Sequence, residues 1–300
     1  MSTESPLISV IIPTFNCCST LRSAIESALS QTYKNIEVIV IDDGSSDETP
    51  LIITSYLNSI IYIKQENGGV AKARNVGVRY SNGEWIAFLD ADDIWDENKL
   101  EYQFSKMSDE GKSWSYTDTR FLGGVNSGRL DSEFTKKHTG SVFDELLTNN
   151  FISTSTVLLN KSTFHNAGGF DTTLPAIEDW ELWVRISSKN PISYVDQPLT
   201  TYRIHKKSTS RNTRKVLPYH LKAINVIYAK NQLNKKQSKL IKKAKSNSYT
   251  ICSYIAEEEN DYVFSLYCAI KSIFNYPRSL RRTLRLIRTS SNLITKPKNT

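Results

Sequence analysis

Residues 7–12, Leu-Ile-Ser-Val-Ile-Ile, followed by Pro-Thr-Phe-Asn at 13–16, are the strongest indication of the fold class. Its nearly uninterrupted apolar run is typical of a strand covered on both faces, and parallel sheets are the usual hosts of such strands. From Ser19 to Leu29 the apolar residues recur at helical spacing, and a second β-branched run occupies 36–41. This part of the chain therefore predicts a strand–helix–strand unit that opens a parallel sheet.

The alternation of strands and helices continues along the chain. Residues 60–63 and 85–89 are two further apolar runs, and residues 70–80 between them have helical spacing. A helical stretch follows at 179–187, among shorter apolar runs. We expect an α/β protein with an open, Rossmann-like sheet joined by right-handed crossovers.

The C-terminal third differs in charge from the rest. Residues 206–300 contain 21 lysines and arginines against four acids, a net charge of +17, whereas residues 1–205 have a net charge of −10. From Lys215 onward the pattern is helical and rich in lysine. We therefore predict an α/β domain at 1–214 and a basic helical region at 215–300.

Composition excludes several classes of protein. A chain of 300 residues, 39% of them apolar, can bury a sizeable core and is not expected to be disordered or fibrous. The net charge of +7 would suit nucleic acid, but the acidic front part would repel phosphates and no nucleic-acid-binding motif is present, so we expect no such partner. We see neither a signal peptide nor an apolar run near the roughly 20 residues that span a bilayer. We expect a cytoplasmic protein, with peripheral attachment to the inner face of the cell membrane as an open alternative.

Acidic side chains follow two of the predicted strands. Asp-Asp-Gly-Ser-Ser-Asp at 42–47 follows the second strand, and Asp-Ala-Asp-Asp at 90–93 follows the strand at 85–89. Ligands of open α/β sheets bind beyond the carboxyl ends of the strands. Clustered carboxylates repel one another unless a cation or a hydrogen-bonding ligand offsets their charge. The sequence therefore predicts a Mg²⁺ or Mn²⁺ site at Asp90 and Asp92.

Six motifs, in chain order, resemble those of family 2 glycosyltransferases. They are Val-Ile-Ile-Pro-Thr-Phe-Asn at 10–16, Asp-Asp-Gly-Ser-Ser-Asp at 42–47, Asn-Gly-Gly-Val-Ala-Lys-Ala-Arg-Asn at 67–75, Phe-Leu-Asp-Ala-Asp-Asp at 88–93, Glu-Asp-Trp at 178–180 and Tyr-Arg-Ile-His at 202–205. The resemblance covers about residues 7–208. It implies a GT-A fold, a nucleotide-diphosphate-sugar donor, a divalent metal (Mn²⁺ or Mg²⁺) and inversion at the anomeric carbon.

The resemblance also assigns residues to the donor nucleotide. Asp43 matches the carboxylate that accepts a hydrogen bond from the imide N–H of uracil, although an Asp-Gly turn is the structural alternative. Pro13 and Phe15 would flank the base, with core packing as the alternative for Phe15. Arg74 would meet donor oxygens or form a surface salt bridge, and Asp90 would meet the ribose.

The remaining assignments concern the metal and the reaction. Asp92 is the expected direct metal ligand, against a helix-capping alternative, and His205 is either a second ligand or a phosphate contact. Asp179 is implied as the general base that deprotonates the acceptor hydroxyl, with Glu178 in support; carboxylates at a helix start can equally be dipole partners. Trp180 stacks on an acceptor sugar or packs inward.

Arginines near the C-terminus alternate with apolar residues at helical spacing. This pattern suits an amphipathic helix on an anionic membrane surface through residues 276–300, or a docked helix with solvated arginines. The arginines are Arg278, Arg281, Arg282, Arg285 and Arg288, and the apolar residues are Leu280, Leu284 and Ile287.

The sequence thus predicts a metal-dependent inverting glycosyltransferase, of the hexosyl- or N-acetylhexosaminyl-transferase class. It would move a sugar, from UDP by preference because of Asp43, to a saccharide or lipid-linked acceptor in surface polysaccharide assembly. A non-catalytic nucleotide-sugar-binding module and a nucleotidyltransferase remain the alternatives.

Overall fold

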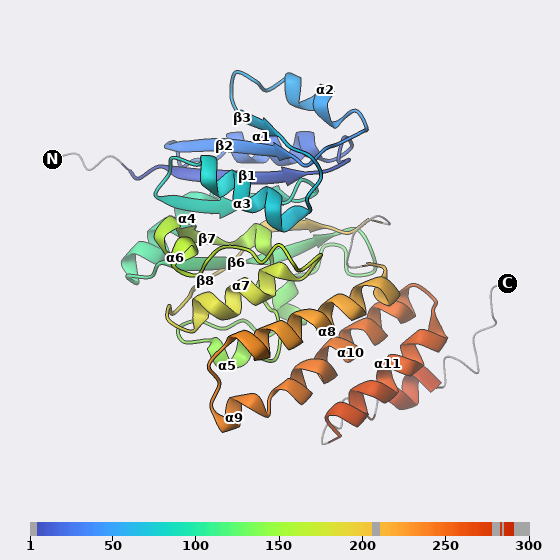
Figure 1. The fold of residues 1–300 in the computed structure, drawn as a ribbon. Coiled ribbons are helices and arrows are strands. Elements are labelled where there is room, and N and C mark those ends of the chain that lie inside the picture. Colours follow the sequence, from blue (N-terminus) through green and yellow to red (C-terminus); the bar gives the residue numbers. More distant parts are fainter. Residues whose placement is uncertain (1–4, 206–210, 278–282, 284, 291–300) are drawn as a thin grey trace. The chain divides into compact units, whose positions relative to one another are not determined.

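The computed structural model of the chain divides into two compact units (Figure 1). It describes residues 5–205, 211–277, 283 and 285–290. The first unit comprises Met1–Val142 and Phe151–Ile204, and the second comprises Phe143–Asn150 and His205–Thr300. The units therefore change over at Ile204 and His205, whereas the sequence prediction put its domain boundary at 214.

An eight-stranded sheet, with the order β3-β2-β1-β4-β7-β6-β8-β5, forms the centre of the first unit (Figure 1). The neighbours β3, β2, β1 and β4 pair in parallel, as predicted. β7 is antiparallel to both β4 and β6, and β5 is antiparallel to β8, so the complete sheet is mixed. The strands are β1 Ile8–Thr14, β2 Ile36–Asp42, β3 Ile61–Lys64, β4 Trp85–Phe88, β5 Ile94–Trp95, β6 Trp114–Leu122, β7 Leu158–Asn160 and β8 Ser193–Arg203.

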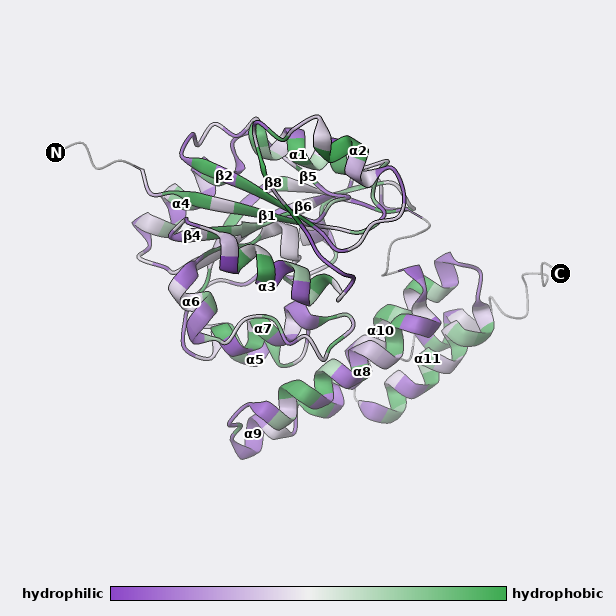
Figure 2. Cartoon of the chain, turned by 45° about the horizontal axis from the view of Figure 1, so that its top comes forward, coloured by the Kyte–Doolittle hydropathy of each residue, from purple (hydrophilic) through white to green (hydrophobic). Residues whose placement is uncertain are grey.

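Helices cover both faces of this sheet. Val10 of β1 and Val38 of β2 share a core cluster with Ile25 of α1 and Leu100 of α4, so α1 and α4 lie on one face. Figure 2 shows β1 and β2 as strongly hydrophobic, as strands covered on two faces must be. The helices of this unit are α1 Leu21–Leu29, α2 Thr49–Thr54, α3 Val70–Tyr80, α4 Lys99–Asp109, α6 Lys161–Asn166 and α7 Glu178–Ser187, with 3₁₀ turns η1 Asp131–Glu133 and η2 Thr154–Thr156.

The opposite face of the sheet packs closely against α3. Ile11 and Ile41 point to this face, and a Cβ added at Gly77 of α3 would come within 2.5 Å of the Ile11 side chain. Glycine at this position lets the helix backbone approach the sheet. This approach brings the start of α3 to the carboxyl ends of β1 and β2.

The sequence pattern did not predict β6, and of β8 it showed only the apolar run at 192–195. In β6 the buried positions include Ser115, Thr117 and Thr119, so hydroxyl side chains replace the apolar run that a buried strand usually shows. The Thr117 hydroxyl meets the Thr200 hydroxyl of β8 at 3.4 Å, and the two strands pair in parallel. Hydrogen-bonded hydroxyls can be buried at low cost, which explains how a polar sequence forms a central strand.

The second unit is helical, as its spacing predicts. A small core forms around Leu217, Tyr249, Cys252 and Cys268. Among the described residues, no helix combines the length and the apolar character needed to cross a membrane. The helices are α5 Phe143–Leu146, α8 Thr213–Lys230, α9 Lys235–Ser238, α10 Ile241–Glu258 and α11 Tyr262–Asn275.

The structure corrects the prediction for part of the arginine-rich segment. Arg278, Arg281 and Arg282 lie outside the described residues. Arg285 is not solvated: it is only 3% exposed, and its guanidinium donates to the Ser253 carbonyl oxygen at 2.6 Å. The neighbouring Ile287 is exposed instead. Arg288 is exposed, as predicted, so the described residues depart from the predicted pattern at Arg285 and Ile287.

Candidate active site

The carboxyl ends of the parallel strands lie along one edge of the sheet. Thr14 of β1 pairs with Asp42 of β2, and the Asp43 N–H donates to the Thr14 carbonyl oxygen at 2.9 Å. Beyond the strands, the side-chain oxygen of Asn16 accepts from the Ser46 N–H at 2.8 Å. The loops that follow β1 and β2 are thus fixed to each other at the edge where α/β proteins bind ligands.

Asp43 is buried and organises the loop that leads into α3. Its carboxylate accepts from Gln65 Nε2 at 2.6 Å, from the Gly68 N–H at 2.9 Å and from the Gly69 N–H at 2.8 Å. Gly69 has a φ of +86°, a conformation that glycine adopts without strain. The structure therefore gives Asp43 a positioning role, and its contact with a base stays a prediction.

The two other residues predicted to flank the base have different environments. Pro13 is buried in β1, where it pairs with Ile41. Phe15 is 47% exposed, so core packing is wrong for this ring. An exposed aromatic ring at the ligand-binding edge of the sheet is compatible with stacking on a base.

Arg74 of α3 joins two other motifs in a buried ion-pair cluster. Its Nη2 lies 2.5 Å from Asp90 Oδ1, and its Nη1 lies 2.5 Å from Glu178 Oε1. The side chain is only 4% exposed, so the surface salt bridge considered for it is wrong. Burial by itself lowers the pKa of Arg74, but the two carboxylates raise it above the ordinary value, and the guanidinium stays charged. The cluster links the end of β4, α3 and the start of α7.

Asp179 follows Glu178 at the start of α7 and is half-buried. Its Oδ1 accepts from the Trp180 N–H at 2.7 Å, and its Oδ2 accepts from Thr154 Oγ1 at 3.1 Å. Burial and the neighbouring Glu178 carboxylate raise the pKa of Asp179 to about 6, although Arg74 and both hydrogen bonds act in the opposite direction. A carboxylate with this pKa is ionised at neutral pH and basic enough to accept a proton in a transition state.

The backbone just before α7 is strained. Ile177 has a φ of +65°, which is unfavourable for a β-branched residue. Strain of this kind persists only where the surrounding contacts hold it, and it is often found at functional sites. Here it sets the direction in which Glu178 and Asp179 leave the loop.

The acids after β4 crowd negative charge into a small volume. Asp93 is buried, where it accepts from Ser155 Oγ at 2.6 Å and from the Arg203 N–H at 3.1 Å. Burial, followed by the charges of Asp90 and Asp92, raises the pKa of Asp93 well above its ordinary value. A bound cation would offset this excess of negative charge.

The carboxylates of this loop fit a hard divalent cation. Mg²⁺ and Mn²⁺ prefer oxygen ligands, and in phosphate-binding sites they take one or two carboxylates together with substrate oxygens. No group of three or more His, Cys, Asp and Glu side chains suited to a metal was found in the described part of the chain. A cation held by Asp90 and Asp92 would therefore take its remaining ligands from the donor or water. His205 belongs to the second unit, and its ligand role stays a prediction.

Trp180 packs inward. It is 2% exposed, and its neighbour Trp183 is fully buried with its ring centroid 6.0 Å from that of Trp114. Neither ring presents a free face to a sugar. The structure therefore gives Trp180 a supporting place beneath the site.

Sequence reasoning missed the hydroxyl residues of η2. Thr154 donates to Asp179, and Ser155 donates to Asp93 and accepts from the Asp90 N–H at 3.1 Å. The sequence feature that could have indicated them is the run Ile-Ser-Thr-Ser-Thr-Val at 152–157, in which small hydroxyl residues precede a strand. These two residues hold three of the acids that line the site.

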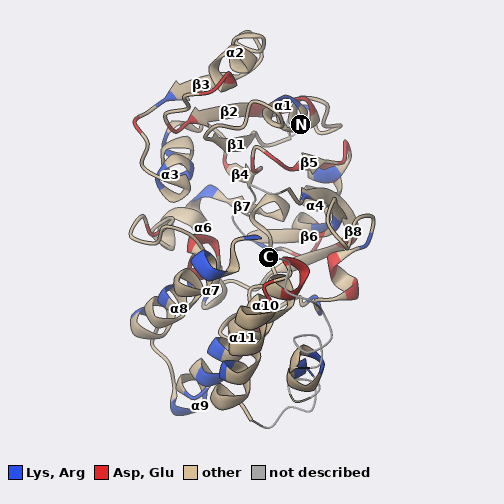
Figure 3. Cartoon of the chain, turned by 90° about the vertical axis from the view of Figure 1, so that its right-hand side faces the viewer, with Lys and Arg blue, Asp and Glu red and all other residues tan. Residues whose placement is uncertain are grey.

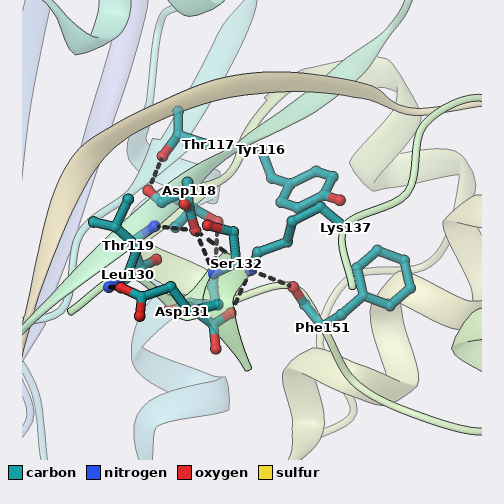
Figure 4. A network of polar contacts seen from close by, with 12 residues as sticks. Tyr116, Thr117, Asp118, Thr119, Leu130, Asp131, Ser132, Lys137 and Phe151 are labelled. Carbon is teal, nitrogen blue, oxygen red and sulfur yellow. Dashed lines mark hydrogen bonds and ion pairs between the residues drawn. The ribbon is translucent and has the colours of Figure 1, made fainter. Parts of the chain in front are cut away.

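A buried lysine anchors the segment that leads to η2 (Figure 4). Lys137 Nζ forms ion pairs with Asp131 and, at 3.8 Å, with Asp118 of β6. It also donates to the Phe151 carbonyl oxygen at 3.5 Å, three residues before Thr154. The loop after β6 and the segment before η2 are therefore held together by one buried cation.

Comparison with known proteins agrees with this arrangement. The Glycosyl transferase family 2 profile matches residues 9–167. An uncharacterized glycosyltransferase of Rickettsia prowazekii is 34% identical over 212 residues, which are 69% of this chain and 66% of that protein. The Escherichia coli UDP-Glc:alpha-D-GlcNAc-diphosphoundecaprenol beta-1,3-glucosyltransferase WfgD is 34% identical over 215 residues, 70% of this chain and 82% of WfgD.

A solved structure shares the fold over nearly the whole chain. The mannosyltransferase PcManGT from Pyrobaculum calidifontis, solved with GDP-Man and Mn²⁺, has a TM-score of 0.66. The match covers 98% of this chain and 82% of that chain, at 16% identity. The mixed sheet and the C-terminal helices therefore define a GT-A fold. The chain belongs to glycosyl transferase family 2, a family of transferase enzymes.

Proposed function

We propose that the protein is a metal-dependent, inverting glycosyltransferase of surface polysaccharide assembly. It transfers a hexosyl or N-acetylhexosaminyl group from a nucleotide-diphosphate sugar to a hydroxyl of a saccharide or lipid-linked saccharide. The observation that carries the proposal is the buried cluster in which Arg74 joins Asp90 to Glu178, next to Asp179 with its raised pKa. The cluster combines donor-side acids and a base in one site.

A uridine diphosphate sugar is the proposed donor. Asp43 offers an acceptor for the imide N–H of uracil at the end of β2, and the exposed ring of Phe15 offers a stacking surface. The relative WfgD uses UDP-Glc according to its name. Asp90 would contact the ribose.

Asp179 acts as the general base in the proposed reaction. It takes the proton from the acceptor hydroxyl while that oxygen forms a bond to the anomeric carbon. The bond from this carbon to the diphosphate breaks, and its electron pair leaves with the nucleoside diphosphate. Because attack and departure are on opposite faces, the anomeric configuration inverts. Glu178 and Arg74 keep Asp179 in place and tune its pKa.

A divalent cation bound by Asp90 and Asp92 would neutralise the charge that develops on the departing diphosphate. Support comes from the crowded acids of the loop and from the Mn²⁺ in the structure of PcManGT. The acceptor of WfgD is, by its name, a saccharide linked through diphosphate to undecaprenol. We propose an acceptor of this lipid-linked class for the present chain.

The test is product release from UDP-, dTDP- and GDP-sugars, with Mn²⁺ or Mg²⁺ and with a chelator, in the presence and absence of a lipid-diphosphate-linked saccharide. We expect release of a nucleoside diphosphate from one donor, strongest with the acceptor and lost on chelation. Release of pyrophosphate from a nucleoside triphosphate would instead indicate a nucleotidyltransferase. Donor binding without turnover would indicate a non-catalytic binding module.

A further inference from the structure

Helix α11, which packs against α10, buries small residues and exposes large apolar ones. On α11 the buried residues are small: Ser265, Cys268, Ala269 and Ser272. Four large apolar residues at spacing i, i+4, i+7 and i+11 are exposed instead: Val263, Tyr267, Ile270 and Phe274. At 100° per residue these two sets lie on opposite sides of the helix. We call the exposed set the apolar stripe.

Serine side chains provide much of the contact between the two helices. Ser246 of α10 donates to the Ser272 carbonyl oxygen at 2.7 Å, and Ser253 donates to the Ser265 carbonyl oxygen at 2.9 Å. These bonds join the helices closely, and Tyr249 of α10 adds one aromatic contact, its ring centroid 6.4 Å from that of Tyr267. Helices that pack through small and hydroxyl residues leave their large apolar residues for other surroundings, as helices in lipid do. A surface helix of a protein in water normally buries its large apolar residues and exposes its polar ones.

The charges around the hairpin favour an anionic partner. All four acids of residues 206–300 have partners within the unit: Glu257 pairs with Arg285, Glu258 with Arg211 and Asp261 with Arg214, and Glu259 accepts from Thr213. Figure 3 shows these acids near the turn between α10 and α11, and basic residues around α9.

A lysine also borders the apolar stripe directly. Lys271 is exposed, and its Nζ lies 5.7 Å from the centroid of the Tyr267 ring. An aromatic ring with a cation beside it suits the boundary between lipid tails and head groups.

We propose that the apolar stripe of α11 is the face through which the protein binds an anionic lipid bilayer. Phe274, the most exposed of the four at 82%, would enter the acyl region together with Ile270. Lysines of the unit, Lys271 among them, would meet the anionic head groups. A second copy of the chain is the other occupant to consider, but two surfaces of a region with a net charge of +17 would repel each other.

This binding face would bring the enzyme to a lipid-linked acceptor. That consequence of membrane binding rests on the proposed function. Binding itself needs neither donor nor acceptor. Vesicle binding and sugar transfer are therefore measured separately, and either can fail without the other.

The test is flotation of the full chain with vesicles of equal parts phosphatidylglycerol and phosphatidylcholine. We expect the wild type to float and to bind more weakly to vesicles of phosphatidylcholine alone. The double variant Ile270→Ser/Phe274→Ser should lose about tenfold or more of the bound fraction, because two apolar side chains no longer enter the bilayer. Leu51→Ser/Val125→Ser, at two exposed apolar positions of the first unit, is the matched control and should float as the wild type does.

Circular dichroism and transfer to a water-soluble acceptor verify that the double variant is folded. Equal flotation of the wild type and Ile270→Ser/Phe274→Ser would overturn the proposal. A wild-type dimer in analytical ultracentrifugation that the same substitutions dissociate would also overturn it, in favour of a second copy on the stripe.

Discussion

The two units each bury an arginine, and the two arginines differ in what surrounds them. Arg74 lies between Asp90 and Glu178, with the charge of Asp179 also close enough to act on it. Arg285 pairs with Glu257, donates to the Ser253 carbonyl oxygen and lies 4.0 Å over the Tyr254 ring.

The difference separates a site from a structural contact. Around Arg74 the acids outnumber the cation, so negative charge remains for a metal, a sugar hydroxyl or a proton. Around Arg285 one carboxylate is joined by neutral serine oxygens, and little charge remains to bind anything. A buried arginine is therefore no sign of function by itself, and our proposed site rests on the excess of acids around Arg74.

The largest expected effect comes from replacing the proposed base, Asp179, by a side chain of the same shape. Asp179→Asn should lower the rate of sugar transfer by about 10³-fold, because the amide cannot accept the proton. Donor affinity, measured by calorimetry with the UDP-sugar, should change little. Transfer at an unchanged rate would remove Asp179 from the mechanism.

Replacing each buried arginine by glutamine tests the difference between Arg74 and Arg285 directly. Arg74→Gln leaves the buried Glu178 and the partly exposed Asp90 without a cation. It should lower the free energy of unfolding by about 3 kcal/mol and abolish most transfer. Arg285→Gln should lower stability less, because Arg288 still lies 3.4 Å from Glu257. Urea unfolding and transfer to a water-soluble acceptor are the two measurements.

In Arg285→Gln, transfer per folded molecule should equal that of the wild type. A large loss of transfer without a loss of stability would contradict the purely structural role of Arg285.

The pH dependence of the transfer rate at acid pH should depend on the protonation of Asp179. The transfer rate should fall about tenfold per pH unit below the pKa of Asp179, about 6, as the base becomes protonated. This folded pKa is above the ordinary value of 3.8, so the ionised carboxylate destabilises the fold at neutral pH. That cost is complete above pH 6 and disappears as the pH falls toward 4.

Asp179→Asn should therefore also raise the Tm at pH 8 and lose this advantage near pH 4. An acid limb that persists unchanged in the residual activity of Asp179→Asn would assign it to another group.

The smallest expected effect is at Thr154. Thr154→Val removes the hydroxyl that donates to the Asp179 carboxylate, and this hydrogen bond lowers the pKa of Asp179. The acid limb should move to higher pH by about half a unit, since one hydrogen bond to the charged form is lost. Thr156→Val, whose hydroxyl donates to the Ser153 carbonyl oxygen, is the control and should leave the limb in place.

The parallel half of the sheet and the acids at its edge could be predicted from the amino-acid sequence. Continuous β-branched runs such as 8–14 and 36–42 have one simple interpretation, and the carboxyl ends of parallel strands meet at one edge. The helices of the C-terminal third could also be predicted, from the helical spacing of their apolar residues. The six ordered motifs then indicated the family that the profile match supports.

Which charged side chains contact one another follows from the folded chain and could not be predicted from the sequence. Arg74 and Glu178 are 104 residues apart, and no local pattern links them. Thr154 and Ser155 look like loop residues until η2 places them against Asp179 and Asp93. The apolar stripe of α11 could not be predicted from the sequence either. Amphipathic spacing shows that a helix has two faces, but not which of them is buried. That choice depends on the partner helix, whose serines accept the small-residue face.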